Sequence, residues 1–152
     1  MTKHRTPYIR CIALAVIIDD NSLFVAEGKD PITKEYYYRP LGGGIEYGEL
    51  GHDALAREMQ EELGQELNEI EYLTTIENHF TYRGEKGHEM VRCYTAEFKN
   101  RKIYRQTQVM GKEDNGRSFK ALWVPIKEFE NNKKRLVPNE LLFAIQCLTI
   151  ED

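Results

Sequence analysis

The order of apolar and polar residues divides the chain into strand-like and helix-like segments. Residues Ile9 to Ile18 are mostly apolar or β-branched and show no helical period. The polar residues 19–21 then turn the chain, and the apolar segment Ser22 to Glu27 follows, which predicts a hairpin in a buried sheet. The same criteria predict further strands at Tyr36 to Pro40, Ile70 to Glu77, Glu89 to Phe98 and Phe119 to Val124.

Two other segments show the period of a helix. Between Leu50 and Leu63 apolar residues recur every four positions, and Gly64 follows as a C-terminal stop. A second helix is predicted to start at Pro138, because proline fits the first turn of a helix. The predicted buried faces are Leu55, Met59 and Leu63 in the first helix and Leu141, Ile145 and Leu148 in the second.

This order of elements indicates the fold class. Strands interrupted by one helix in the middle and one at the end favour an α/β or α+β domain, with helices packed on a mixed sheet. A length of 152 residues is that of one ordinary globular domain, so we expect a single domain over residues 1–152. The long polar segment 99–118 has two interpretations, a flexible hairpin loop or a mobile segment over a substrate.

Composition excludes some classes of partner. Lys and Arg total 21 against 25 Asp and Glu, a net charge of -4, which argues against capture of nucleic acid or an anionic membrane. The apolar run that ends before Asp19 is too short to span a membrane. Three widely spaced cysteines, Cys11, Cys93 and Cys147, indicate small core residues in a reducing cytoplasm.

Candidate chemistry lies around the first helix. Gly42 to Gly44 follow Pro40, and we expect them to end the preceding strand in a backbone turn that approaches a ligand closely. Glu58, Glu61 and Glu62 then crowd one helix flank, where each like-charge pair costs roughly 0.2–0.5 kcal/mol. A solvated acidic face could tolerate this cost. The alternative is a hard cation such as Mg²⁺, which prefers carboxylate oxygens and substrate phosphates.

Eight positions of this region resemble the signature of the Nudix hydrolase family. They read G-x5-E-x7-R-E-U-x-E-E-x-G, where U is a bulky aliphatic residue, and Gln65 stands where the family has a second apolar residue. The matching residues are Gly43, Glu49, Arg57, Glu58, Met59, Glu61, Glu62 and Gly64.

The resemblance implies a Nudix-type α/β/α sandwich and hydrolysis of a nucleoside diphosphate linked to another moiety. It implies Mg²⁺ or Mn²⁺ as cofactor and catalysis by Glu58 and Glu61, with Glu58 the first candidate for the base that activates water. Arg57 and Glu49 would brace the loop and helix by an ion pair. The implied metal ligands are Glu58, Glu61, Glu62 and the Gly42 carbonyl, and by their position at a strand start we add Glu89 as a ligand and His88 as a candidate.

The sequence leaves the substrate open. A small-molecule nucleotide is expected, and the first proline after the motif, Pro125, disfavours ADP-ribose, whereas Tyr82 is a weak indication of dinucleoside polyphosphates. Two rivals remain: a nucleotide sensor without catalysis, and a hydrolase of RNA 5′ phosphates. The oligomeric state is open and includes a homodimer. Candidate contacts are the aromatic residues Tyr36, Tyr37, Tyr38, Phe80, Tyr82 and Trp123 and the arginines Arg10, Arg39, Arg83 and Arg92.

Overall fold

The structure is a computed structural model that describes residues 7–150, with side chains up to residue 148. The expected domain covers residues 1–152, of which 1–6 and 151–152 lie outside the described range. In chain order the elements are β1 (Arg10–Val16), β2 (Ile18–Asp19), β3 (Ser22–Lys29), β4 (Tyr36–Arg39), β5 (Gly42–Gly44), α1 (Gly51–Leu63), β6 (Leu67–Tyr82), β7 (Glu85–Phe98), the 3-10 helix η1 (Arg101–Arg105), β8 (Gln108–Lys112), β9 (Ser118–Pro125), α2 (Ile126–Glu130) and α3 (Leu141–Ile150).

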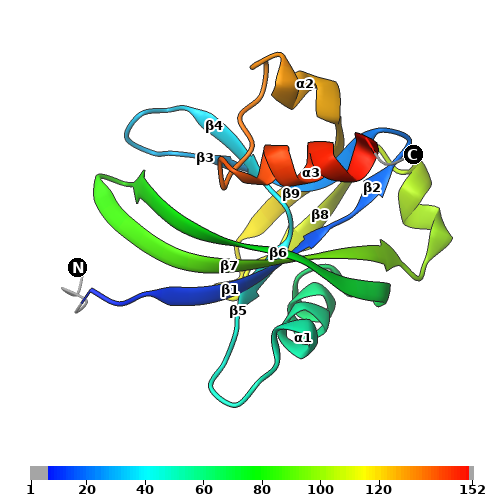
Figure 1. Cartoon of the computed structure of the whole chain (residues 1–152), viewed down its shortest axis with the longest axis horizontal. Coiled ribbons are helices and arrows are strands. Elements are labelled where there is room, and N and C mark those ends of the chain that lie inside the picture. Colours follow the sequence, from blue (N-terminus) through cyan, green and yellow to red (C-terminus); the bar gives the residue numbers. More distant parts are fainter. Residues whose placement is uncertain (1–6, 151–152) are drawn as a thin grey trace.

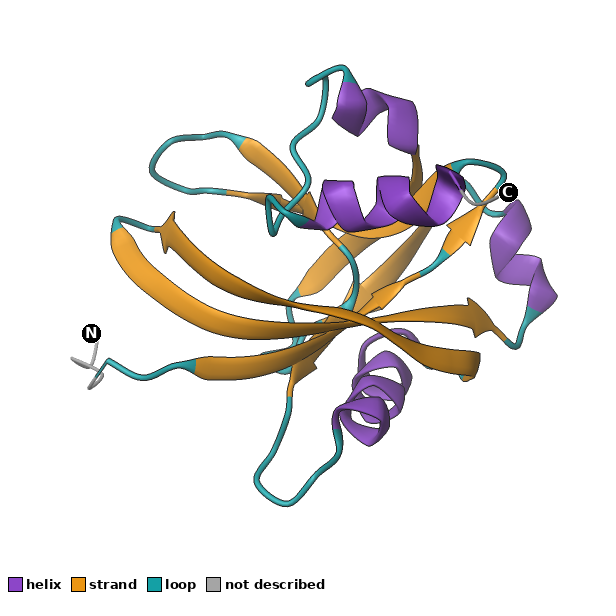
Figure 2. Cartoon of the chain, in the orientation of Figure 1, coloured by secondary structure: helices purple, strands orange, loops and turns teal. Residues whose placement is uncertain are grey.

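The strands form two sheets that lie between helices. One sheet has the order β5-β1-β7-β6, and the other has the order β2-β3-β9-β8, with β4 also paired to β3. The pairing of β1 with β7 is parallel and the other pairings are antiparallel, so the first sheet is mixed. Helix α1 lies on one side of the strands, and α2 and α3 lie on the other (Figure 1, Figure 2). This arrangement confirms the predicted α/β/α sandwich with a mixed sheet.

Strand β1 is buried on both faces because each face meets a separate apolar cluster. Ile12, Leu14 and Val16 belong to the cluster that includes Leu141 and Ile145 of α3. The intervening Ala13 and Ala15 belong to the cluster that includes Leu55 and Met59 of α1. A strand covered on both faces reads as a continuous apolar run, which explains why this segment shows no alternation of apolar and polar residues.

The chain changes sheets just after β1. Ile17 separates β1 from β2, and β2 forms the hairpin with β3 in the other sheet. Asp20 and Asn21 form its turn with φ of 48° and 60°, a conformation that these two residue types tolerate well. The predicted hairpin is confirmed, but the segment from Ile9 to Ile18 is not one strand.

The prediction of a turn at the three glycines is wrong. Gly42 to Gly44 form β5, which pairs antiparallel with β1. A Cβ atom on Gly42 would overlap the carbonyl oxygen of Ala13, so the missing side chain permits close strand pairing rather than a turn. The turn comes later, in residues 45–50 before α1.

The second half of the chain contains more regular structure than its polarity suggests. Strand β6 is longer than predicted at both ends and is joined to β7 by Arg83 and Gly84. Strand β7 ends at Phe98 as predicted, but the predicted start at Glu89 is wrong, because the strand begins at Glu85. Segment 99–118 contains η1 and β8, and the Trp123 indole donates a hydrogen bond to the Ile103 carbonyl at 3.1 Å. The interpretation of this whole segment as a flexible loop is therefore wrong.

The predictions for the C-terminal helix and for the cysteines are each confirmed only in part. Leu141 and Ile145 are fully buried on α3 and Leu148 is half-buried, although the helix begins at Leu141 rather than at Pro138. All three cysteines are free, but only Cys93 is a core residue, because Cys11 and Cys147 are exposed.

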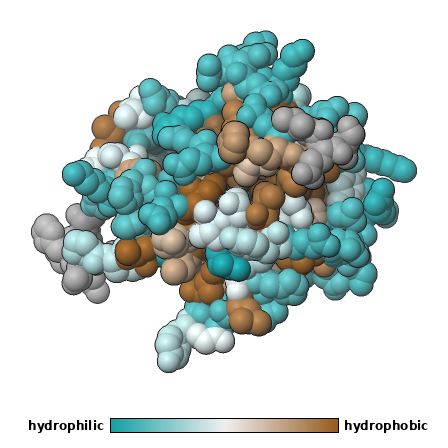
Figure 3. Space-filling view, viewed as in Figure 1, coloured by the Kyte–Doolittle hydropathy of each residue, from teal (hydrophilic) through white to brown (hydrophobic). Residues whose placement is uncertain are grey.

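The surface carries both polar and apolar side chains. Figure 3 shows hydrophilic side chains around the rim of one face and apolar side chains gathered towards its centre. Within residues 7–150, none of the helices has the length and hydrophobicity that a transmembrane span requires.

Candidate active site

Helix α1 carries an apolar stripe and an acidic flank side by side. Leu55 and Met59 are fully buried, and Leu63 packs against the same cluster. Gly64 ends the helix in the left-handed conformation, φ 65°, and its N–H donates to the Gln60 carbonyl at 2.9 Å. The predicted helix, its stripe and its stop are confirmed.

Glu58 is a buried carboxylate on the acidic flank. It is 6% exposed, and a Cβ atom on Gly43 of β5 would overlap its carboxyl group. Glycine at this position therefore makes the space in which the Glu58 carboxylate lies. Burial raises the pKa of Glu58 while the bond from Arg57 opposes that rise.

Arg57 holds the loop before α1 against the helix. Its Nε and Nη2 atoms donate to the two carboxylate oxygens of Glu49 at 2.9 and 3.0 Å, and Nη2 also donates to the Gly44 carbonyl at 3.0 Å. Its Nη1 donates to Glu58 Oε1 at 2.9 Å and to Glu61 Oε2 at 3.3 Å. The predicted ion pair of Arg57 with Glu49 is confirmed, and Arg57 also orients two acidic groups of the helix.

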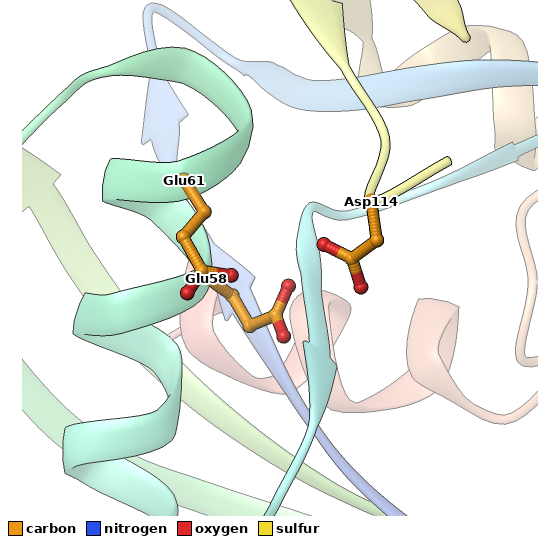
Figure 4. A group of neighbouring side chains, drawn as sticks. All are labelled: Glu58, Glu61 and Asp114. Carbon is orange, nitrogen blue, oxygen red and sulfur yellow. The ribbon is translucent and has the colours of Figure 1, made fainter. Parts of the chain in front are cut away.

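A third carboxylate joins Glu58 and Glu61 from a distant part of the chain. Asp114 lies in the turn between β8 and β9, and one oxygen of each of the three residues lies within 4.8 Å of the others. Figure 4 shows Asp114 on the opposite side from the two glutamates of α1. An all-carboxylate donor set with one buried member suits a hard divalent cation such as Mg²⁺ or Mn²⁺.

Asp114 was missed by the sequence reasoning. Its signal was weak: an acidic pair at residues 113–114, followed by the turn residues Asn115 and Gly116, in a segment already considered as a cover for substrate. Only the pairing of β8 with β9 brings the turn to α1, and that pairing is a long-range property of the fold.

Glu62 lies close to the trio but is not part of it. Burial raises its pKa to about 8, helped by the charges of Glu58 and Asp114, while Arg39 acts in the opposite direction. The site therefore holds more negative charge than its arginines balance. A bound cation would relieve this repulsion.

Glu89 is buried and does not belong to the trio. It is 6% exposed, with Arg10 Nη1 at 3.8 Å and Asn78 Nδ2 at 3.5 Å. By strand alternation it shares a face of β7 with Val91, in the cluster on the α3 side, whereas α1 packs on the opposite face. Its role as a metal ligand stays a prediction.

His88 and Gly42 are likewise placed within strands. The ring of His88 packs against His79 of β6 at 4.2 Å between centroids, well inside the β6–β7 hairpin. Gly42 is buried in β5. The part of its carbonyl in metal binding stays a prediction.

A pocket adjoins the acidic groups between β3, β4, α1 and the β8–β9 turn. Arg39, unlike the other three candidate arginines, lines it, as does Tyr37, whose ring lies against Gly28 and packs on Tyr82. The lining residues are Ala26, Glu27, Gly28, Tyr37, Arg39, Leu41, Glu62, Glu113 and Phe119.

Several other candidate contacts are already engaged elsewhere. Trp123 packs against Phe24 and Tyr104 at the cluster on the α1 side and is only partly exposed. Arg92 stacks on Tyr72 and donates to the Tyr94 hydroxyl at 3.0 Å.

Comparisons with known proteins agree with this fold. The family model described as NUDIX domain matches residues 9–144. A NUDIX hydrolase of Nitrosomonas europaea is 20% identical with a TM-score of 0.62, covering 93% of this chain and 87% of that one. A NUDIX-family hydrolase of Clostridium perfringens is 18% identical with a TM-score of 0.63, covering 95% and 99%. The MutT NUDIX hydrolase of Burkholderia pseudomallei is 19% identical with a TM-score of 0.58, covering 79% and 85%.

No curated protein sequence matches the chain significantly. The sandwich of helices and mixed sheet, with a glutamate-rich helix beside the strand of glycines, places the chain in the fold class of these hydrolases. With the match over residues 9–144, the chain belongs to the NUDIX domain family and is a Nudix hydrolase.

Proposed function

We propose that the protein hydrolyses a diphosphate bond in a nucleoside diphosphate linked to another moiety, and that the reaction depends on Mg²⁺ or Mn²⁺. The observation that carries this proposal is the approach of Asp114 to Glu58 and Glu61, which provides oxygen ligands from two separate elements. A solvated acidic helix face would need no such third carboxylate. Excess or modified nucleoside triphosphates fit the reaction class.

Each acidic residue and Arg57 has a proposed role in the reaction. Glu58, Glu61 and Asp114 would hold the metal with Glu62 nearby, and the bound metal would neutralise the diphosphate and make water easier to deprotonate. Arg57 donates to Glu58 Oε1 and Glu61 Oε2, which would leave the second oxygen of each carboxylate for the metal. Glu58 is the proposed base, because it lies in the trio and would be close to a water bound by the metal.

The nucleotide is proposed to lie in the pocket beside Glu62. Arg39 supplies a cation there for phosphate oxygens, and Tyr37 and Phe119 supply aromatic surface for a base. One structure with a similar fold is titled an ADP compounds hydrolase, at 18% identity and a TM-score of 0.62, which accords with a nucleotide substrate. The identity of the nucleobase stays open.

The two rival functions fit the site less well. A sensor without catalysis would not need the complete set of motif carboxylates, all of which are present. A hydrolase of RNA 5′ ends would benefit from a basic surface, whereas the chain carries a net charge of -4. We further propose that the protein acts in the cytoplasm as a single domain. A homodimer remains a prediction that light scattering would test.

The experiment is release of phosphate and pyrophosphate from a panel of nucleotides, with Mg²⁺, with Mn²⁺ and with chelator. The panel holds nucleoside triphosphates, nucleotide sugars, ADP-ribose, dinucleoside polyphosphates and triphosphorylated RNA. Glu61→Gln tests the site, and Glu71→Gln, an exposed glutamate on β6, is the control for loss of one charge. Turnover of one class that is lost with Glu61→Gln and chelator supports the proposal. Binding of nucleotides without turnover across the panel would instead favour the rival function, a nucleotide sensor without catalysis.

A further inference from the structure

The β8–β9 hairpin carries two acidic residues to the site on a well-defined turn. The Glu113 N–H donates to the Arg117 carbonyl at 2.8 Å, and the Gly116 N–H donates to the Glu113 carbonyl at 2.9 Å. The Asn115 side chain accepts from the Arg117 N–H at 2.9 Å. Because the turn is fixed to its strands, the place of Asp114 depends on how closely β8 approaches α1.

That approach occurs at Gly111 of β8. Gly111 is buried, and a Cβ atom added to it would lie 2.9 Å from the carbonyl oxygen of Glu62, in the last turn of α1. The same Cβ would overlap the ring of Phe119, its partner across the hairpin. The backbone of Gly111 does not lie in the left-handed region, so the absence of a side chain serves close packing alone.

Electrostatic repulsion opposes this close packing. Glu58, Glu61 and Glu62 on α1 face Asp114 of the hairpin, and Glu113 lines the pocket with Glu62. Like charges brought together in this way favour a larger separation of hairpin and helix. The hairpin nevertheless lies close to α1 at Gly111, so packing at this glycine sets the spacing of the two elements against the repulsion.

We propose that Gly111 is a positioning residue of the metal site, which sets the spacing between the β8–β9 hairpin and α1 at which Asp114 joins Glu58 and Glu61. The inference rests on the proposed function, because it takes the trio as a binding site for a divalent cation. Gly111 itself offers no ligand. It acts only through the position of Asp114.

The test is direct binding of Mg²⁺ by calorimetry and of Mn²⁺ by electron paramagnetic resonance, on the full chain without nucleotide. Gly111→Ala is expected to weaken metal binding by about 10-fold or more, the range found for groups that orient metal ligands. The matched control is Met110→Ala on the same strand, whose side chain is 60% exposed, and it should bind as the unaltered protein does. Thermal melts in chelator establish that each variant is folded.

A double variant distinguishes two possible causes of weak metal binding, namely a larger spacing between the hairpin and α1, and displacement of the Phe119 ring. In Gly111→Ala combined with Phe119→Leu, the overlap with the ring is relieved but the contact with the Glu62 carbonyl remains. Metal binding should therefore stay weak. Recovery in the double variant, or unchanged binding in Gly111→Ala, would overturn the inference and leave the proposed function intact. Absence of metal binding by the unaltered protein would instead overturn the metal site itself.

Discussion

At the scale of single residues, a missing side chain shapes this site as much as the carboxylates do. Gly43 makes room for the Glu58 carboxyl group, and it belongs to a strand, so its value is space rather than turn formation. The backbone of Gly43 lies outside the left-handed region, which means that alanine would fit its conformation. Any effect of alanine there must come from the added methyl group.

Gly43→Ala is therefore expected to lower kcat/KM by about 100-fold, because displacement of a catalytic group by roughly 1 Å can have that effect. The control is the neighbouring Gly44→Ala, whose Cβ would meet only Arg10 Nη2 at an ordinary 3.5 Å and which keeps the carbonyl that Arg57 binds. Steady-state kinetics with saturating Mg²⁺ measures both. Equal activity in the two variants would mean that Glu58 does not act from the position seen in this structure.

At the scale of elements, predictability followed the range of the interactions that fix each element. Helix α1 was predictable because its stripe and its glycine stop are local signals. Strand β8 was not, because it is mostly exposed and is defined by its pairing with β9. The acidic helix was therefore foreseen, whereas Asp114, which depends on that pairing and on packing against α1, was not.

The end of α1 provides a prediction about the motif glycine at position 64. A Cβ atom there would meet no atom within 4 Å, but the left-handed conformation costs an ordinary L-residue roughly 1–2 kcal/mol. Gly64→Ala should therefore lower the free energy of unfolding by about that amount, and Gly64→Asn by less, because asparagine tolerates this conformation. Urea unfolding followed by circular dichroism measures both.

The Gly64 variants should lose stability but not catalytic activity. A Cβ atom on Gly64 would reach no other group, so kcat measured per folded molecule should stay within about twofold of the unaltered protein. A large fall in kcat at unchanged stability would contradict the assignment of Gly64 to helix termination and would place it in catalysis.

At the scale of the whole molecule, folding brings together negative charges that the extended chain keeps apart. Glu58, Glu61 and Glu62 meet Asp114, which lies about fifty residues further along the sequence, while Arg57 and Arg39 balance only part of this charge. The metal-free fold therefore includes a local repulsion. Since this repulsion exists only in the folded state, it should make stability depend on pH and on divalent cations.

The pH dependence follows from Glu62, whose pKa rises from an ordinary 4.5 to about 8 in the folded protein. Between these values the folded state retains a proton that the unfolded chain has lost, so stability in chelator should fall as pH rises from about 5 to 8. In a chain of this size each 1 kcal/mol moves Tm by roughly 2–4 °C, so thermal melts across this range would detect it. Glu62→Gln should flatten the profile, and Mg²⁺ should raise Tm more at pH 8 than at pH 5, because fewer protons compete with the cation for the carboxylates at the higher pH. A flat profile in chelator, or a gain from Mg²⁺ that is equal at pH 5 and pH 8, would show that the carboxylates are not coupled as this structure places them.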